Sequence, residues 1–234
     1  MTPTETNTAR ATLFVRAIAL LFLVALLSVI FQLDLLLASN GLLPAADRMA
    51  MDDPTRPPTL FSLSASDLML WLVTVLGALG ALVTLFGKLP RAGLALAWLA
   101  FHGVSVAGAG LFDLVADTLL IQLGLVAMAM LWAPRSPWPR RLGALLICKV
   151  MFESALHKVL GVAHDGGWLN GAAMGSFFEV AAIPGPLAPS ANTLAQPVLL
   201  LVGWGVLFIE LLGPFLLLGP PRVRRLIIVS WLGL

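Results

Sequence analysis

The run LFVRAIALLFLVALLSVIFQLDLLL, residues 13–37, decides the fold class of this chain. Its two ionisable residues, Arg16 and Asp34, lie near its ends. A helix needs ~20 mostly apolar residues to cross the ~30 Å hydrocarbon layer of a membrane, so this run predicts a membrane-spanning helix. The run is too long for the apolar part of a cleavable signal peptide, so we expect the helix to be retained.

Five further apolar runs have a similar length, at residues 68–87, 92–110, 113–132, 142–161 and 197–219. The sequence therefore predicts an all-α integral membrane protein, one domain over residues 1–234, with six complete transmembrane helices. A last run, LIIVSWLGL, follows Arg225 and is only about 14 Å long as a helix, too short to span. It lies in the membrane interface or begins a seventh helix of a longer chain. The arginines at 222, 224 and 225 favour the second interpretation.

Composition agrees with this prediction. Of the 234 residues 59% are hydrophobic and 11% are charged, and the net charge is only +2. Soluble domains have about 25% charged residues, so these values exclude a disordered chain, an ordinary soluble enzyme and a nucleic-acid-binding module. The single cysteine, Cys148, excludes an internal disulfide framework and a cysteine-based zinc site.

The lysines and arginines between the spans predict the orientation, because short cytoplasmic loops are enriched in them. With the N-terminus in the cytoplasm, ten basic residues lie inside: Arg10, Arg16, Lys88, Arg91, Arg135, Arg140, Arg141, Arg222, Arg224 and Arg225. The outer loops then hold only Arg48 and Arg56. The long connections 38–67 and 162–196 are therefore expected outside. Short loops and an Ala/Leu/Gly-rich composition favour a bacterial inner membrane over the endoplasmic reticulum.

Ionisable side chains are rare and costly within a membrane, and the 142–161 run has four of them. Lys149, Glu153 and His157 are spaced at i, i+4 and i+8, and Lys149 and Glu153 are expected to pair within the helix. Lys158 points about 100° away from His157. These residues either form a proton-exchanging site with Lys158 as base or charge anchor, or an ion pair that holds helices together.

Glu210 lies deep in the last complete run, where its carboxyl group must be protonated, paired with a cation or in contact with water. Lys149 and His157 are its candidate partners. The three histidines are scattered without the paired spacing of a metal site, so no metal is predicted. The sequence also lacks the hydrolase, phosphate-loop and dinucleotide-binding motifs.

Several segments, in order, resemble the lipase maturation factor family. They are NGLLPA at 40–45, DTLL at 117–120, FESALHK at 152–158, DGGW at 165–168, FFEVAAIPGPL at 177–187 and ELLGPF at 210–215. The resemblance implies a membrane protein that assists maturation of secreted enzymes. It also implies that Asp165, Trp168, Glu179 and Glu210 bind a substrate or partner.

The segment around Lys158 is also similar to the membrane domain of vitamin K-dependent gamma-carboxylase and to DoxX-like quinone-linked proteins. This second resemblance implies a catalytic role for Lys158 as base, with Glu153 or His157 relaying protons, and a quinone-like lipid as cofactor. The polar column of residues 149–157 favours that interpretation. The apolar side chains within 177–187 disfavour it, because the family has polar groups there.

Three functions therefore remain open from sequence. The first is a maturation factor, not itself an enzyme, with secreted hydrolases as clients and the lipid bilayer as its environment. The second is a membrane enzyme or redox protein acting on a quinone-like or vitamin K-like lipid. The third is a structural bundle whose function lies in a domain beyond residue 234. The order of the matched segments favours the first, although a shared fold alone does not establish a mechanism.

Overall fold

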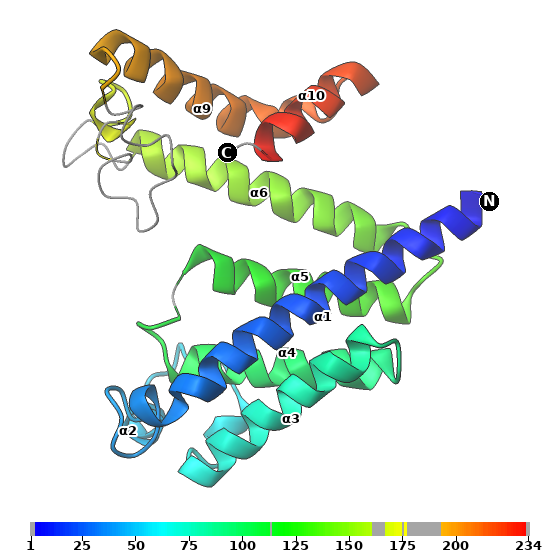
Figure 1. Ribbon diagram of the computed structural model, residues 1–234, viewed down its shortest axis with the longest axis vertical. Helices are drawn as coiled ribbons and strands as arrows, with labels where there is room; N and C mark the ends of the chain where they lie inside the picture. The colour runs from blue at the N-terminus through cyan, green and yellow to red at the C-terminus, as the bar shows by residue number, and fades with distance from the viewer. Residues whose placement is uncertain (1–2, 113, 161–166, 175, 177–192, 233–234) are drawn as a thin grey trace. The chain divides into compact units, whose positions relative to one another are not determined.

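The computed structural model describes residues 3–112, 114–160, 167–174, 176 and 193–232, and every regular element within them is helical (Figure 1). The elements are α1 (Pro3–Leu36), α2 (Ala45–Ala50), the 3-10 helix η1 (Leu60–Ser62), α3 (Asp67–Leu85), α4 (Pro90–Ala107), α5 (Val115–Trp132), α6 (Trp138–Leu160), α9 (Gln196–Leu216) and α10 (Pro221–Leu232). The prediction of an all-α membrane protein is confirmed for this part of the chain.

Four of the described helices are long and apolar enough to cross a membrane: Ala9–Leu36 within α1, and the whole of α3, α5 and α9. The two other predicted spans are helices, but they fall outside this group. α4 has 18 residues, and it opens with Pro90 and Arg91 and contains His102. α6 is less apolar because it includes two arginines, two lysines and Glu153. Six complete spans therefore remain a prediction.

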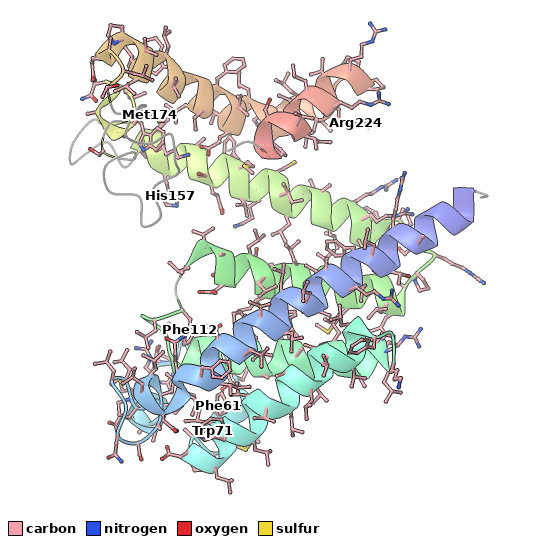
Figure 2. The ribbon with its side chains drawn as sticks, viewed as in Figure 1. Phe61, Trp71, Phe112, His157, Met174 and Arg224 are labelled. Atoms are coloured by element: carbon pink, nitrogen blue, oxygen red, sulfur yellow. The ribbon has the colours of Figure 1, made fainter. Side chains whose placement is uncertain are left out.

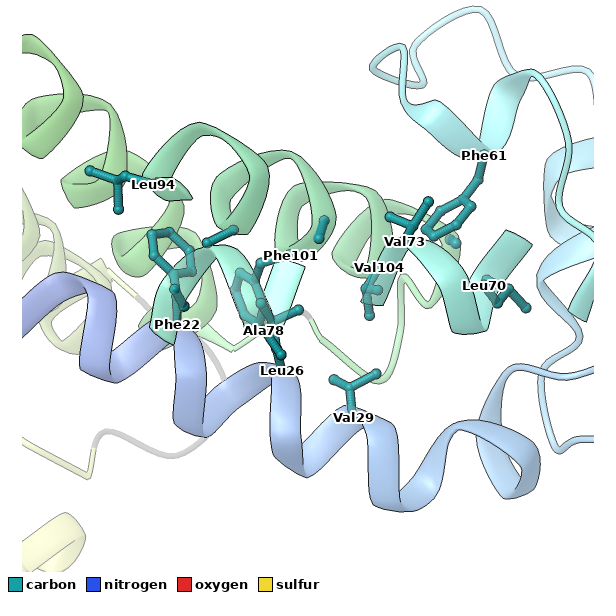
Figure 3. Close-up of a cluster of buried hydrophobic side chains, with 14 of the residues drawn as sticks. Phe22, Leu26, Val29, Phe61, Leu70, Val73, Ala78, Leu94, Phe101 and Val104 are labelled. Carbon is teal, nitrogen blue, oxygen red and sulfur yellow. The ribbon is translucent and has the colours of Figure 1, made fainter. Parts of the chain in front are cut away.

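The chain divides into two compact units, Met1–Gly143 and Ala144–Leu234. In the first unit α1, α3, α4 and α5 pack around an apolar core, and α1 runs diagonally across α4 and α5 with α3 alongside it (Figure 1). Phe22 and Leu26 of α1, Leu70 of α3, and Phe101 and Val104 of α4 are fully buried there (Figure 3). The rings of Phe22 and Phe101 meet edge to face, with centroids 5.7 Å apart.

Small residues allow the backbones of α3 and α4 to approach closely. A Cβ atom added at Gly80 would lie 2.6 Å from the carbonyl oxygen of Gly93, and one added at Gly93 would lie 2.5 Å from that of Gly80. A Cβ at Gly77 would overlap the side chain of Ala100. Close contact through small residues is typical of helix pairs in membranes, where burial away from water cannot drive association.

The first long connection, between α1 and α3, is ordered by specific hydrogen bonds. The carboxylate of Asp67 accepts bonds from the backbone nitrogen (2.8 Å) and the hydroxyl (2.7 Å) of Ser39, which joins the ends of α1 and α3. Arg56 donates to the carbonyl oxygens of Met49 (2.9 Å) and Met51 (2.5 Å). Phe61 is buried against Gly103 of α4. This connection is therefore a folded cap on the unit.

In the second unit α10 packs on α9. The indole nitrogen of Trp231 donates to the carbonyl oxygen of Ile209 at 3.2 Å, and the Trp231 ring lies against Gly213. Ile227 is buried. The last apolar run is helical as far as Leu232, in a helix that begins at Pro221 and includes the three arginines. Both interpretations of this run, in the interface or as the start of a seventh span, stay predictions.

Candidate functional site

The most buried charged group of the described chain is Glu210 of α9, and its partner is Lys158 of α6. The Lys158 Nζ atom donates to both carboxylate oxygens of Glu210, at 2.5 and 2.6 Å. Their side chains are 20% and 7% exposed. The hydroxyl of Ser154, one turn before Lys158, donates to the same carboxylate at 3.4 Å. α6 therefore supplies both donors to the Glu210 carboxylate.

This pairing corrects the sequence analysis, which named Lys149 and His157 as candidate partners of Glu210. The face of α6 that meets α9 includes Ser154 and Lys158, and the neighbouring Ala155 is fully buried. His157 is one residue earlier, about 100° around the helix, and is exposed. The face that lines the site could have been recognised from the i, i+4 spacing of Ser154 and Lys158, but Ser154 was not identified from sequence.

Trp168 completes the surroundings of Lys158. The Lys158 ammonium lies 4.6 Å from the centroid of the Trp168 ring, within the range of a cation–π contact. Two backbone carbonyls that follow Trp168 are held by α9. The indole nitrogen of Trp204 donates to Leu169 (3.1 Å), and the amide of Gln196 donates to Asn170 (3.1 Å). The ion pair and these bonds together fasten the start of the second long connection to the helices.

Met174 and Pro214 shape the same region. Met174 is buried, and a Cβ atom added at Gly203 of α9 would lie 3.2 Å from its Cγ atom (Figure 2). Pro214 lies inside α9 and has no N–H. The carbonyl oxygen of Glu210, four residues earlier, therefore lacks its usual helical donor. Phe215 follows, and its ring packs edge to face on Phe152 of α6, with centroids 5.9 Å apart.

The other predicted residues of α6 form a separate pair. Lys149 Nζ lies 2.6 Å from Glu153 Oε2, so the predicted i, i+4 ion pair is confirmed. Both side chains are about half exposed, at 52% and 47%. The proposed catalytic residues are thus divided: Lys158 is held in the α6–α9 pair, whereas Glu153 and His157 lie on other faces of the helix.

Asp165 and Glu179, the two remaining predicted binding residues, lie outside the described residues. Within the part of the chain that the structure describes, no three His, Cys, Asp or Glu side chains are grouped closely enough to hold a metal ion. The cluster of Ser154, Lys158, Trp168 and Glu210 contains one ion pair, one hydroxyl and one aromatic ring. It also contains the backbone carbonyl oxygen of Glu210, which has no N–H donor at Pro214.

Residues 9–232 match the family model of the lipase maturation factor transmembrane domain. The match includes almost all of both units and every residue of the α6–α9 cluster. Comparison with the curated proteins and with the solved structures finds no significant match. The similarity to gamma-carboxylase and DoxX-like proteins remains a prediction from sequence.

Proposed function

We propose, from the premise that this chain belongs to the lipase maturation factor family, that it assists folding or maturation of secreted enzymes. It is an integral membrane protein, with four described helices long and apolar enough to span. We further propose that α4 and α6 also span, that the N-terminus is cytoplasmic, and that connections 38–67 and 162–196 face outside. The distribution of lysine and arginine supports this orientation.

The observation that carries the proposal is the engagement of Lys158. Two of its N–H donors point at Glu210, and its ammonium lies against the Trp168 ring. An ammonium held by a carboxylate and an aromatic face is a charged anchor, whereas a general base must present a free lone pair to its substrate. The arrangement therefore supports Lys158 as the residue that fixes the outer segment 167–174 to the bundle.

The folded cap supports an interaction with polypeptides. The Ser39–Asp67 and Arg56 bonds hold the backbone of residues 39–67 in place. Four large apolar side chains of this cap nevertheless remain exposed: Leu42, Leu43, Met51 and Leu63. Exposed apolar groups on a fixed scaffold suit transient contact with the apolar segments of an incompletely folded client.

Substitutions of Lys158 distinguish a role as a charged anchor from a role as a general base. Arginine keeps the charge and can bind a carboxylate through two N–H groups, but it is not deprotonated in proteins. Methionine keeps the length and removes the charge. We expect a strain lacking this protein to lose the abundance or activity of a few secreted hydrolases, without a change in their covalent mass. We expect Lys158→Arg to restore them and Lys158→Met not to.

Quantitative mass spectrometry of the secreted proteins measures both quantities. If Lys158→Arg and Lys158→Met fail equally while both proteins accumulate in the membrane, anchoring is the wrong role. If a secreted protein also loses a covalent modification in both variants, such as a carboxyl group on glutamate, the chain is an enzyme. The alternative with a quinone-like lipid and Lys158 as base would then replace our proposal.

A further inference from the structure

The first unit contains a cavity of about 630 Å³ at the end opposite the folded cap. It lies between the first turns of α1 after residue 10, the end of α5 and the turn that leads into α6. In Figure 1 the N-terminal part of α1 and the α5–α6 connection are at the same end of this unit. The volume is within the ~300–1,000 Å³ typical of small-molecule sites.

The cavity has an apolar wall and a basic rim. Val15 of α1 and Met130 and Leu131 of α5 line the wall, and Thr12, Arg135, Ser136 and Arg140 contribute polar side chains. Among the described residues, neither Arg135 nor Arg140 has a hydrogen bond or ion pair with another side chain, and no acid lines the cavity. Two guanidinium groups without a described carboxylate partner, beside the Ser136 hydroxyl, are groups that bind phosphate.

The surroundings reinforce this positive charge. Arg91 lies at the same end, where its Nε atom donates to the carbonyl oxygen of Leu131 at 3.2 Å. Arg16 lies against Gly87 in the α3–α4 turn. The described acidic side chains of this unit lie at the other ends of the helices or in the cap: Asp34, Asp47, Asp52, Asp53, Asp67 and Asp117. The described charged side chains at this end of the unit are therefore arginines.

Two tryptophans mark the level of the cavity relative to a membrane. Trp132 and Trp138 adjoin lining residues in the chain and are 60% and 61% exposed. The guanidinium group of Arg141 lies over the Trp138 ring, 5.3 Å from its centroid. Exposed tryptophan is enriched at the headgroup level of membrane proteins, so the opening lies where lipid headgroups lie.

We propose that this cavity binds the headgroup of an anionic phospholipid. Arg135, Arg140 and Ser136 hold the phosphate, and the glycerol and upper acyl chain lie along Val15, Met130 and Leu131. A soluble phosphate would contact only the basic rim, whereas a phospholipid would contact both the rim and the apolar wall. Anionic lipid in the cytoplasmic leaflet is attracted to clustered basic residues, in agreement with the proposed orientation. This inference is independent of the maturation role and of Lys158.

Lipid titration of the purified full-length chain in detergent tests the proposal. The probes are phosphatidylglycerol and phosphatidylcholine with the same acyl chains, and bound lipid is counted by native mass spectrometry. We expect phosphatidylglycerol to bind more tightly, and the double variant Arg135→Gln/Arg140→Gln to weaken it by about tenfold or more. Arg135→Lys/Arg140→Lys keeps the charge and should retain most of the binding, which shows that the effect is not misfolding.

The matched control is Arg222→Gln/Arg224→Gln, which removes the same charge from α10 in the second unit. We expect it to leave phosphatidylglycerol binding unchanged. Equal binding of the two lipids, or an equal loss in the control, would overturn the proposal, since either result would mean that no headgroup site exists at this cavity. Displacement of the lipid by millimolar inorganic phosphate would also overturn it and assign the rim to a free anion.

Discussion

The helices of the two units are held together by different kinds of contact. In Met1–Gly143 the closest helix pair, α3 and α4, meets through glycine, alanine and threonine, and its core is apolar. In Ala144–Leu234 the α6–α9 pair is joined by an ion pair between a half-buried lysine and a buried glutamate. In lipid, helices associate through close packing or through polar bonds, because apolar burial alone gives little. The first unit should therefore be sensitive to added volume, and the second to a lost charge.

The largest expected effect is that of Lys158→Met on the second unit. Removing one partner of a buried ion pair leaves an uncompensated charge and costs about 3–5 kcal/mol. Cys148 is half-buried on α6, and as the single cysteine it reports unfolding of this unit through its reaction with a thiol dye on heating. We expect the midpoint temperature of labelling to fall steeply.

The double variant Lys158→Met/Glu210→Leu is the control for this prediction. It removes both charges, and replacing a buried ion pair with apolar groups is often neutral or stabilising. We expect most of the lost stability to return. If the double variant is as unstable as Lys158→Met alone, an unpaired Glu210 is not the cause of the loss.

The next largest effect should come from Gly80→Ala in the first unit. The added methyl group would meet the Gly93 carbonyl oxygen at 2.6 Å, so α3 and α4 must separate. Overpacking of this kind costs about 1–3 kcal/mol. Circular dichroism during thermal unfolding in detergent measures the change.

Gly205→Ala in α9 is the matched control, since a Cβ atom there has no neighbour within 4 Å. Alanine is favoured over glycine within a helix by about 1 kcal/mol, so this variant should be as stable as wild type or more stable. Equal destabilisation by the two substitutions would contradict a steric role for the α3–α4 contact.

A smaller effect is expected for Trp168→Leu, which removes the aromatic face from Lys158 but leaves the ion pair. Cation–π contacts contribute about 0.5–2 kcal/mol, depending on their exposure to water. The Cys148 labelling temperature should fall by less than in Lys158→Met. Trp168→Phe should lose less than Trp168→Leu, and an unchanged labelling temperature in Trp168→Leu would exclude the cation–π contact as a stabilising interaction.

Lys149→Gln should have a still smaller effect, although it also breaks a lysine–glutamate pair of α6. This pair is half exposed and lies within one helix, a geometry that contributes about 0.3–0.5 kcal/mol. The same thiol-labelling assay makes the comparison with Lys158→Met direct. A loss as large as that of Lys158→Met would show that burial does not distinguish the two pairs.

The smallest effect concerns Asp53 in the cap. Its pKa is lowered by hydrogen bonds from the Thr55 side chain (2.6 Å) and backbone nitrogen (2.9 Å). A carboxylate whose folded pKa is lowered stabilises the folded form above its unfolded pKa of about 3.9, and this contribution is lost as the pH falls through the folded pKa. The protection of the Thr55 amide against hydrogen exchange, measured relative to its intrinsic rate at each pH, should therefore decrease in acid. A rate that follows the intrinsic pH dependence at every pH would contradict this contact.

The sequence predicted the helices better than their contacts. Hydropathy located the described spanning helices, yet α1 begins at Pro3 rather than Leu13, because a helix continues through polar residues that hydropathy does not score. The Lys149–Glu153 pair was predictable because it follows from spacing within one helix. The Lys158–Glu210 pair joins residues 52 apart, and it depends on which face of α6 meets α9, which the pattern of charges did not reveal.

The diagonal course of α1 has a consequence for bilayer thickness. Its apolar part, Ala9–Leu36, has 28 residues and is about 42 Å long, whereas the 19 residues of α3 extend about 28 Å. α3 matches a hydrocarbon layer of ~30 Å, whereas α1 exceeds it and has a positive hydrophobic mismatch. Part of this excess lies outside the hydrocarbon layer, since Ala11, Thr12 and Val15 line the cavity at the headgroup level, and a tilt of α1 accommodates the rest. Because α1 packs on α3, α4 and α5, its length and the membrane together affect the angle of the first unit. A thicker bilayer favours a more upright α1, and a thinner one favours a larger tilt.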